Sequence, residues 1–272
     1  MQLRNSIKSI AIGSFDGIHK GHQVLINQVE AVVIIERNCA TITAGYRRSL
    51  YLEAFCFFYH FEKVKALTAK AFVKRLKKDF PQLEKIVVGY DFAFGYKKEG
   101  DTTLLKELFD GELIVVDEVK ERNISIHTRT IKSYLSNGEL ITAKGLLGRN
   151  FKIVGKVIKG QGLGKKELVP TLNLKVYDFH LPKSGVYVSK TKIDGEWLNS
   201  VTFLGHRVTT DGLFAIESYV LDRDIGTVTG FIEIEFIDFI RENKKFDSLE
   251  SLKEQIKQDI ETVRRVDLLT IN

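Results

Sequence analysis

The hydrophobic pattern of the chain changes near residue 149, and this change most limits the folds that the sequence can adopt. Before that residue, short apolar runs alternate with stretches whose apolar residues recur at three and four positions, as on one face of a helix. After it, short β-type segments follow one another, separated by Gly, Asp and Lys turns. We therefore expect two domains, residues 1–149 and residues 150–272.

The first part alternates strand patterns with helix patterns. Two short helices at its end are expected on either side of Asn137-Gly138, within residues 128–149. Alternation of this kind is typical of an α/β domain, in which helices cover both faces of a parallel sheet. The other strands are expected over residues 9–15, 31–36, 39–43, 84–90 and 112–119, and the other helices over residues 21–32, 68–80 and 102–109.

The second part is rich in strand patterns and ends in one helix. Repeated short strands with turn signals are typical of an antiparallel sheet or a small barrel. The helix is expected over residues 248–266, with Ser248 or Ser251 as its N-cap. The strands are expected over residues 151–160, 184–193, 196–205, 214–221 and 230–240.

The composition limits the partners and the compartment. With 44% hydrophobic residues in 272, the chain can bury a substantial core, and its two cysteines, Cys39 and Cys56, are too few for a disulfide framework. No apolar run approaches the roughly 20 residues that span a bilayer, and the N-terminus lacks the pattern of a signal peptide. We expect a cytoplasmic protein without a membrane contact, and the composition does not indicate its oligomeric state.

The net charge of +6 is compatible with nucleic acid, with small polyanions such as ATP, or with a solvated lysine-rich surface. Single-strand binders interleave basic residues with aromatic ones in a stripe, and the lysines here are scattered without such a stripe. We therefore expect no nucleic-acid partner.

The stretch GSFDGIHKGH, residues 13–22, places a glycine-rich turn between an expected strand and an expected helix. A helix N-terminus offers unpaired backbone N–H groups to a phosphate, and Gly13 and Gly17 would let the backbone approach it. His19 and His22 would donate hydrogen bonds to phosphate oxygens. In nucleotidyl transfer, charge builds on the α-phosphate and on the leaving pyrophosphate, so fixed donors of this kind supply much of the catalysis.

Two other interpretations of this stretch remain open. It can be a strand-turn-helix connection without chemistry, or a zinc site. Zinc requires more ligands than two histidines, and the other histidines follow no pattern. A P-loop is excluded, because the Lys-Ser/Thr end of that motif is missing. The other histidines are His60, His127, His180 and His206.

A second constellation, GKVIKGQGLGKKELVPTLNL, spans residues 155–174. Its glycines and lysines can wrap a triphosphate, and the Thr171 hydroxyl and Asn173 amide are oxygen ligands suited to Mg²⁺. The alternative is a barrel hairpin with solvated lysines.

The first stretch resembles the G-x-F-D-G-x-H-x-G-H signature of HxGH nucleotidylyltransferases, in the form found in bacterial FAD synthetases. VVGYDFAFGYKKEGD, residues 87–101, resembles that family's second block, and residues 136–151 resemble its closing helices. The resemblance implies a Rossmann-like nucleotidylyltransferase domain with a parallel sheet, in which His19 and His22 are catalytic. The nucleotide-binding residues it implies are Gly13, Phe15, Asp16, Gly17, Asp91 and, from the altered segment HTRTIK, Arg129.

The second constellation resembles the riboflavin kinase signature, a glycine-rich loop that leads into P-T-x-N. LPKSGVYV, FLGHRVTTDG and FAIESYVLD resemble later segments of that family. The resemblance implies an antiparallel β-barrel with a terminal helix. It implies Glu217 as the catalytic carboxylate, Arg207 and Thr209 as flavin-binding residues, and Thr171 and Asn173 as magnesium ligands. The nucleotide-binding residues it implies are Gly155, Gly160, Gly162, Gly164 and Lys165.

Together the two resemblances follow the order of the bifunctional riboflavin kinase/FAD synthetase family. They imply that riboflavin and ATP give FMN and ADP, and that FMN and ATP then give FAD and pyrophosphate, with Mg²⁺ carried mainly by ATP. Where the family has T-F-x-P-H-P, this chain has TITAGYRRSLY, residues 41–51, so Arg47 or Arg48 are candidates for phosphate contacts.

Two alternatives to this function stay open. In the first, only one domain is active and the other is a binding module. In the second, the protein is a flavin-binding regulator without catalysis that uses its basic surface on nucleic acid.

Overall fold

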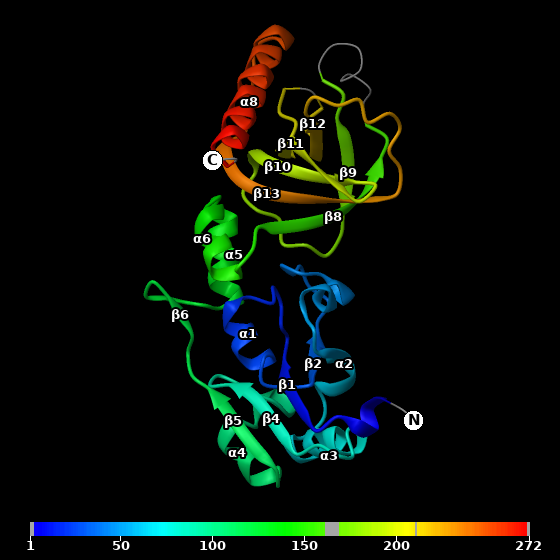
Figure 1. Cartoon of the computed structure of the whole chain (residues 1–272), viewed down its shortest axis with the longest axis vertical. Coiled ribbons are helices and arrows are strands. Elements are labelled where there is room, and N and C mark those ends of the chain that lie inside the picture. The colour runs from blue at the N-terminus through cyan, green and yellow to red at the C-terminus, as the bar shows by residue number, and fades with distance from the viewer. Residues whose placement is uncertain (1–2, 161–168, 210, 271–272) are drawn as a thin grey trace. The chain divides into compact units, whose positions relative to one another are not determined.

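The computed structural model describes residues 3–160, 169–209 and 211–270 (Figure 1). The chain folds into two compact units, Met1–Thr130 and Ile131–Asn272. The domain boundary predicted from the sequence lies between residues 149 and 150. In the structure this position follows two helices, α5 (Thr128–Asn137) and α6 (Leu140–Leu147). As expected, these helices are separated at Asn137-Gly138.

The first unit contains a five-stranded parallel sheet, which confirms the expected α/β class. The strand order is β3-β2-β1-β4-β5, so β1 lies in the centre with β2 and β4 on either side. The bounds are β1 (Ser9–Gly13), β2 (Ala31–Glu36), β3 (Phe55–His60), β4 (Lys85–Gly89) and β5 (Glu112–Val116).

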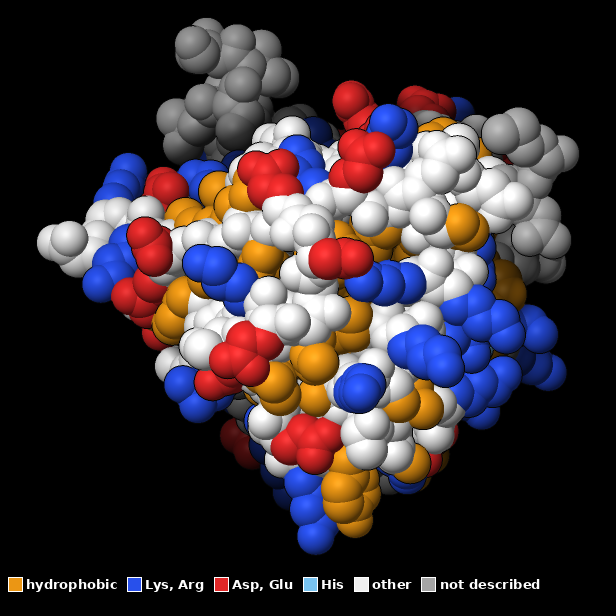
Figure 2. All heavy atoms as spheres, turned by 90° about the horizontal axis from the view of Figure 1, so that it is seen from below, with side chains coloured by type: hydrophobic (Ala, Val, Ile, Leu, Met, Phe, Trp, Pro, Cys, Tyr) orange, Lys and Arg blue, Asp and Glu red, His pale blue; other side chains and the backbone are white. Residues whose placement is uncertain are grey.

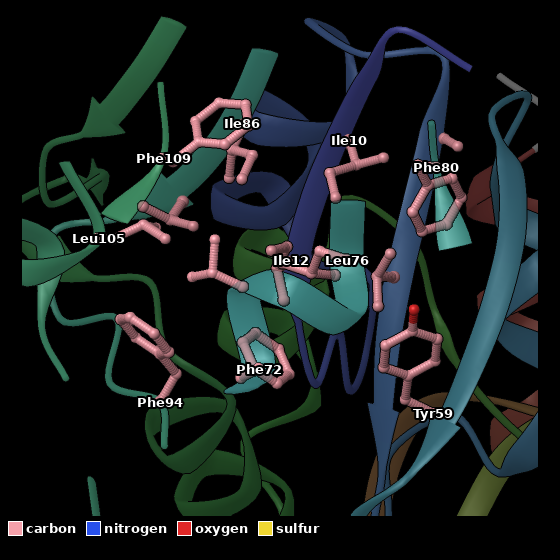
Figure 3. Close-up of a cluster of buried hydrophobic side chains, with 14 of the residues drawn as sticks. Ile10, Ile12, Tyr59, Phe72, Leu76, Phe80, Ile86, Phe94, Leu105 and Phe109 are labelled. Atoms are coloured by element: carbon pink, nitrogen blue, oxygen red, sulfur yellow. The ribbon is translucent and has the colours of Figure 1, made fainter. Parts of the chain in front are cut away.

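Both faces of this sheet are covered, because the central strands are apolar at successive positions. Ile10 and Ile12 of β1 face α3 (Ala69–Asp79) and α4 (Thr102–Leu108), and Figure 3 shows Leu76 of α3 beside Ile12. Ala11 faces the opposite side, where α1 (Lys20–Ile26) packs. The alternation along β1 thus places its carboxyl end, where the glycine-rich turn begins, between two packed layers.

Two expected elements differ from the structure. The helix expected over residues 21–32 ends at Ile26, because residues 31–36 form a strand of the sheet. The prediction of a strand over residues 39–43 is wrong. The backbone N–H groups of Ile42 and Thr43 donate to the carboxylate of Asp16 instead of to a neighbouring strand.

The strand β3 was not expected from the sequence. Its segment FCFFYH lies at the edge of the sheet and shows no clean alternation. Shorter elements complete the first unit. They are η1 (Leu3–Ser6), η2 (Gly45–Tyr51), α2 (Phe61–Val64), η3 (Tyr96–Lys98), β6 (Lys120–Glu121) and β7 (Ile124–Ser125).

The second unit is built on a closed six-stranded barrel, as the antiparallel pattern and the family resemblance led us to expect. Its strands follow the order β10-β11-β12-β9-β8-β13 and pair antiparallel, and β13 closes the barrel on β10. The bounds are β8 (Phe151–Ile158), β9 (Leu172–Val176), β10 (Gly185–Ile193), β11 (Glu196–His206), β12 (Phe214–Val220) and β13 (Phe231–Arg241).

The barrel interior contains a cluster of hydroxyl groups. Ser189 lies 2.8 Å from Ser200 and 2.7 Å from Thr202, and Thr191 lies 2.7 Å from Ser218. Each of these side chains is almost fully buried. Because the hydroxyls satisfy one another, the cluster avoids the cost of unpaired buried polar groups and ties together β10, β11 and β12.

The terminal helix α8 (Leu249–Thr270) covers part of the barrel wall. Ser248 is its N-cap, since the Ser248 hydroxyl accepts a hydrogen bond from the N–H of Ser251, which itself lies inside the helix. A two-point ion pair between Asp259 of α8 and Arg241 of β13 joins the helix to the barrel, with Arg241 Nη2 2.7 Å from Asp259 Oδ2. Only 3% of the Asp259 side chain is exposed.

Replacing Asp259 by alanine is expected to lower the free energy of unfolding by about 3 kcal/mol, because the guanidinium of Arg241 then loses its buried partner. Urea denaturation measures this loss. The matched control is Glu254→Ala, which removes an exposed i,i+3 pair with Lys257 on the same helix and should cost less than about 0.5 kcal/mol. Equal losses in the two variants would contradict the structural role of the Asp259 pair.

The surface carries charges of both signs. Figure 2 shows acidic and basic side chains spread over one face, with hydrophobic side chains between them. No helix among the described residues is both long and apolar enough to cross a membrane.

Candidate active sites

The glycine-rich turn after β1 adopts a strained backbone. Phe15 has φ of 46° and Ile18 has φ of 41°, in the left-handed region that residues with a Cβ rarely occupy. Gly17 has φ of 92°, and a Cβ there would also lie 3.3 Å from Ile42. The side chains of Phe15 and Ile18 are buried in the hydrophobic core, and this packing offsets the strain in their backbone. The turn is therefore held in one shape.

The two histidines of this turn lie together at the start of α1. Nδ1 of His19 accepts a hydrogen bond from the backbone N–H of His22 at 3.2 Å, so His19 is the N-cap of the helix. This bond leaves Nε2 as the nitrogen that carries the proton in the neutral His19 ring. The two imidazoles stack with their centroids 3.5 Å apart, and Phe15 meets His22 edge-on.

Gly21 has a role that sequence reasoning did not assign. A Cβ at this position would lie 3.2 Å from Nδ1 of His19 and 3.2 Å from the carbonyl oxygen of Ile126. The glycine between the two histidines therefore makes room for the capping ring. The helix itself is only seven residues long, so the histidine side chains, more than a helix dipole, define this site.

Asp16 is buried and uses its carboxylate within the chain. Oδ1 of Asp16 accepts the N–H groups of Ile42 and Thr43 at 2.7 and 3.1 Å, and its carbonyl oxygen accepts the hydroxyl of Thr128 at 2.9 Å. Asp16 thus connects the histidine turn with residues 41–51 and with the start of α5. Its contact with nucleotide, predicted from the sequence, stays a prediction.

The second block lies at the carboxyl end of β4. Phe92 and Phe94 pack on the hydrophobic core, so the phenylalanines act as the plug of a strand-end turn, whereas Asp91 is exposed. The hydroxyl of Tyr90 lies 3.3 Å from Nε2 of His127, which immediately precedes α5. The turn that carries Asp91 is therefore joined to the segment that carries Arg129.

Glu118 contributes to the same junction. Its Oε1 lies 3.5 Å from Nε2 of His127, and hydrogen bonds from Ser125 and Lys120 lower the pKa of Glu118 to about 2. The carboxylate is thus ionised at neutral pH, and it lies beside the His127 ring as a second partner after the Tyr90 hydroxyl.

The three arginines of the first unit that the sequence suggested for phosphate contacts differ in their surroundings. Arg129 lies in the first turn of α5, is exposed, and has no ion pair within the described part of the chain. Arg48 is 2% exposed, with Nη1 3.5 Å from Oε1 of Glu36 at the end of β2. Arg47 lies over the ring of Tyr46. Of these three, Arg129 is the most exposed, and its contact with phosphate stays a prediction.

Glu217 of β12 forms a chain of charges with two residues of the β11–β12 loop. Oε1 of Glu217 accepts a hydrogen bond from Nη1 of Arg207 at 3.0 Å. Arg207 also donates from Nε and Nη2 to the two carboxylate oxygens of Asp211, at 3.0 and 2.8 Å. Burial raises the pKa of Glu217, while the guanidinium of Arg207 opposes that rise.

Of the two predicted magnesium ligands, Asn173 faces Glu217 and Thr171 contacts Asn173. Asn173 of β9 is directly opposite Glu217 in the ladder, and its Nδ2 lies 3.5 Å from the Thr171 hydroxyl. A Cβ at Gly160 would lie 2.8 Å from Cγ of Asn173, so this glycine leaves room for the amide. Hydroxyl and amide oxygens are hard ligands that suit Mg²⁺, so these residues fit a Mg²⁺-nucleotide. No cluster of three or more His, Cys, Asp or Glu side chains that could hold a metal occurs among the residues the structure describes.

The other residues that the resemblance implies for the barrel site have different surroundings. Gly155 lies within β8, where a Cβ would come 2.8 Å from Leu174, so strand packing requires a glycine there. The Thr209 hydroxyl accepts the N–H of Phe246 at 3.2 Å. Gly162, Gly164 and Lys165 lie outside the described residues. The predicted nucleotide and flavin contacts of this group stay predictions.

Sequence reasoning did not single out two residues that bind predicted site residues, Thr128, which contacts Asp16, and Asp211, which contacts Arg207. Thr128 lies within HTRTIK and Asp211 within FLGHRVTTDG, but neither matches a position that the family resemblance singled out. A helix N-terminus beginning with Thr was a signal for the first. For Asp211, the only signal was its place in FLGHRVTTDG, close to Arg207.

Two family models match the chain. The FAD synthetase model matches residues 2–44 and 43–133, and the riboflavin kinase model matches residues 147–266. The first match contains the histidine turn and the second block. The second match contains Thr171, Asn173, Arg207 and Glu217.

Proteins with similar sequences match nearly the whole length of this chain. Proteins named bifunctional riboflavin kinase/FMN adenylyltransferase from Listeria monocytogenes and from Escherichia coli K12 are 29% and 28% identical to it. These matches cover 94% and 96% of this chain and 91% and 93% of the relatives. A solved structure from Streptococcus pneumoniae, described as a macrolide-efflux protein, has a TM-score of 0.83 at 27% identity, with 97% of each chain covered. From its two motif sets, its two folds and these relatives, the chain belongs to the bifunctional riboflavin kinase/FAD synthetase family.

Proposed function

We propose that the chain makes FAD in two transfers from ATP, one at each site. In the barrel unit riboflavin is phosphorylated to FMN, and in the first unit FMN is adenylylated to FAD with release of pyrophosphate. The observation that carries the proposal is that each unit has its own set of reactive groups. These are the stacked His19 and His22 after β1, and Glu217 opposite Asn173 in the barrel.

In adenylyl transfer, an oxygen of the FMN phosphate attacks the α-phosphorus of ATP while the bond to pyrophosphate breaks. His19 and His22 would donate hydrogen bonds to the phosphate oxygens on which charge accumulates. The hydrogen bond from the His22 N–H to Nδ1 of His19 orients the His19 ring, so its donor is fixed before substrate binds. Arg129 would bind the phosphates from the start of α5, which Thr128 connects to Asp16.

In the kinase reaction, the oxygen of riboflavin's primary hydroxyl attacks the γ-phosphorus of ATP while the bond to ADP breaks. Glu217 would accept the hydroxyl proton, and Arg207 would hold one oxygen of that carboxylate in place. The raised pKa of Glu217 makes it a better proton acceptor than an exposed carboxylate. Neither transfer needs a covalent intermediate with the protein.

Magnesium bound with ATP would neutralise charge on the phosphates. Thr171 and Asn173 would hold it through their side-chain oxygens, next to the carboxylate of Glu217.

Replacing Gly160 by alanine is expected to raise the Mg²⁺ concentration needed for half-maximal FMN formation several-fold, because the new Cβ would displace the Asn173 amide. Titrating Mg²⁺ at fixed ATP measures this change. Gly145→Ala is the matched control, since nothing lies within 4 Å of a Cβ at that position in α6. An unchanged Mg²⁺ requirement in Gly160→Ala would remove Asn173 from the predicted metal site.

Incubating the purified protein with riboflavin and Mg-ATP, and separating FMN and FAD by chromatography, tests the function itself. Both products are expected, with FMN appearing first. FMN without FAD would restrict the chain to kinase activity, and neither product would favour the non-catalytic regulator. The cytoplasmic location and the absence of a nucleic-acid partner stay predictions from the sequence.

A further inference from the structure

The β11–β12 loop holds Arg207 in one orientation. The N–H of Arg207 donates to the Leu213 carbonyl at 3.0 Å, and the N–H of Gly212 donates to the Arg207 carbonyl at 3.1 Å. Oδ1 of Asp211 also accepts the N–H of Leu213 at 3.1 Å. The loop thus presents the Asp211 carboxylate to the guanidinium across a short hydrogen-bonded turn.

Asp211 occupies one whole edge of that guanidinium. Nε and Nη2 of Arg207 donate to separate oxygens of Asp211, which leaves Nη1 for Glu217. Because a guanidinium is rigid and planar, fixing one edge also fixes the direction of Nη1. The Arg207 side chain is 17% exposed and that of Asp211 is 27% exposed, so solvent weakens this pair only in part.

As a consequence, Arg207 contacts only one oxygen of Glu217. Oε1 of Glu217 accepts Nη1, and Oε2 has no hydrogen-bond partner among the described residues. Asn173 faces Glu217 from β9 and apolar Phe203 faces it from β11. An arginine released from Asp211 would be able to form a two-point pair with Glu217, which would occupy both of its oxygens.

We propose that Asp211 is a positioning residue of the kinase site, which restricts Arg207 to one oxygen of Glu217 and so reserves the other for the primary hydroxyl of riboflavin. The inference rests on the proposed role of Glu217. In the reaction, the hydroxyl proton passes to Oε2 while the hydroxyl oxygen bonds to the γ-phosphorus and the bond to ADP breaks. Asp211 touches neither substrate. It acts by holding Arg207, and its negative charge also helps to raise the pKa of Glu217 directly.

The experiment measures riboflavin kinase kinetics of the full chain. Asp211→Asn is expected to lower kcat for FMN formation roughly 10- to 100-fold, because proton acceptance by Glu217 is impaired, while KM for ATP stays within about twofold. Asp211→Glu keeps the carboxylate and should recover most of the lost kcat. Asp211→Ser, which keeps a possible acceptor for the Leu213 N–H but has no charge, should behave as Asp211→Asn does. FAD formation from supplied FMN should stay unchanged in all three.

The matched control is Asp222→Asn, which breaks an exposed aspartate–arginine pair with Arg264 in the same barrel unit. It should leave kcat unchanged.

A second test combines Asp211→Asn with Arg207→Lys. The lysine side chain lacks the planar guanidinium that Asp211 would orient. If Asp211 acts through Arg207, the double variant is no slower than Arg207→Lys alone, so the effects are not additive.

Two results would overturn the inference. One is a kcat within about twofold of wild type in both Asp211→Asn and Asp211→Ser, well short of the loss expected when a general base is impaired. The other is a double variant whose loss is the product of the single losses. The proposed role of Glu217 fails separately, and is recognised by Glu217→Gln retaining its kcat whatever the Asp211 variants do.

Discussion

Replacing Glu217 by glutamine is expected to reduce FMN formation by roughly 10²- to 10⁴-fold, the contribution typical of a general base. Glutamine has nearly the same shape and its amide oxygen can still accept Nη1 of Arg207, so the barrel wall should stay intact. The side chain can no longer accept the proton of riboflavin's primary hydroxyl. Steady-state kinetics with riboflavin and Mg-ATP measure the loss.

The same preparation contains its own control. Conversion of supplied FMN to FAD should proceed at the wild-type rate, because it takes place at the histidine turn of the other unit. Glu196→Gln is the matched substitution, since Glu196 is an exposed barrel glutamate paired with Arg223, and it should keep both activities. Wild-type FMN formation in Glu217→Gln, or loss of both activities in a folded protein, would rule out the two-site assignment.

Replacing His22 by alanine is expected to have the opposite effect. FAD formation should fall by roughly 10²- to 10³-fold, the loss typical of removing one donor to a developing charge. His22 is the cleaner target of the two histidines, because His19 is also the N-cap of α1 and its loss would cost about 1 kcal/mol of helix stability. Chromatography of the products from riboflavin and Mg-ATP should show FMN accumulating without FAD.

Kinase activity shows that the barrel unit of this variant is folded, and thermal unfolding reports on the unit that contains His22. A thermal unfolding curve should overlay that of wild type, since His22 is only partly buried and its ring lies on His19 and Phe15 at the surface end of the core. Normal FAD formation by His22→Ala would show that the stacked pair is not the adenylyl-transfer site.

The local patterns succeeded where neighbours in sequence set the conformation. The helix over residues 68–80 was expected from its three-four periodicity, and the structure contains it as α3, capped by Thr68. The strand over residues 31–36 was expected from its apolar run and is β2. The same reasoning failed over residues 39–43, because the Asp16 carboxylate, 26 residues from Ile42, takes the N–H groups that a strand would have donated.

The same contrast between local patterns and distant contacts holds for the residues of the two candidate sites. The histidine turn, Asn173 and Glu217 were predicted from their motifs. The structure stacks the two histidines and places Asn173 opposite Glu217, and the roles of these residues stay predictions. Asp211 was not found, because its importance depends entirely on the position of Arg207 relative to Glu217. Gly21 lies within the first motif, but the need for a glycine there comes from the ring of His19 and from the carbonyl of Ile126, which is far away in the sequence.

The sequence by itself indicated an α/β part and a β-rich part, and its motifs, through the family resemblance, indicated the two activities and the side chains predicted to perform them. These depend on hydrophobic periodicity and on short motifs, which are properties of neighbouring residues. Only the tertiary structure decided which distant groups meet. It connects Asp16 with residues 42, 43 and 128, and it places Arg207 between Asp211 and one oxygen of Glu217. Such contacts arise when the backbone closes a sheet or a barrel and brings residues far apart in the chain within hydrogen-bond distance, which a local pattern does not encode.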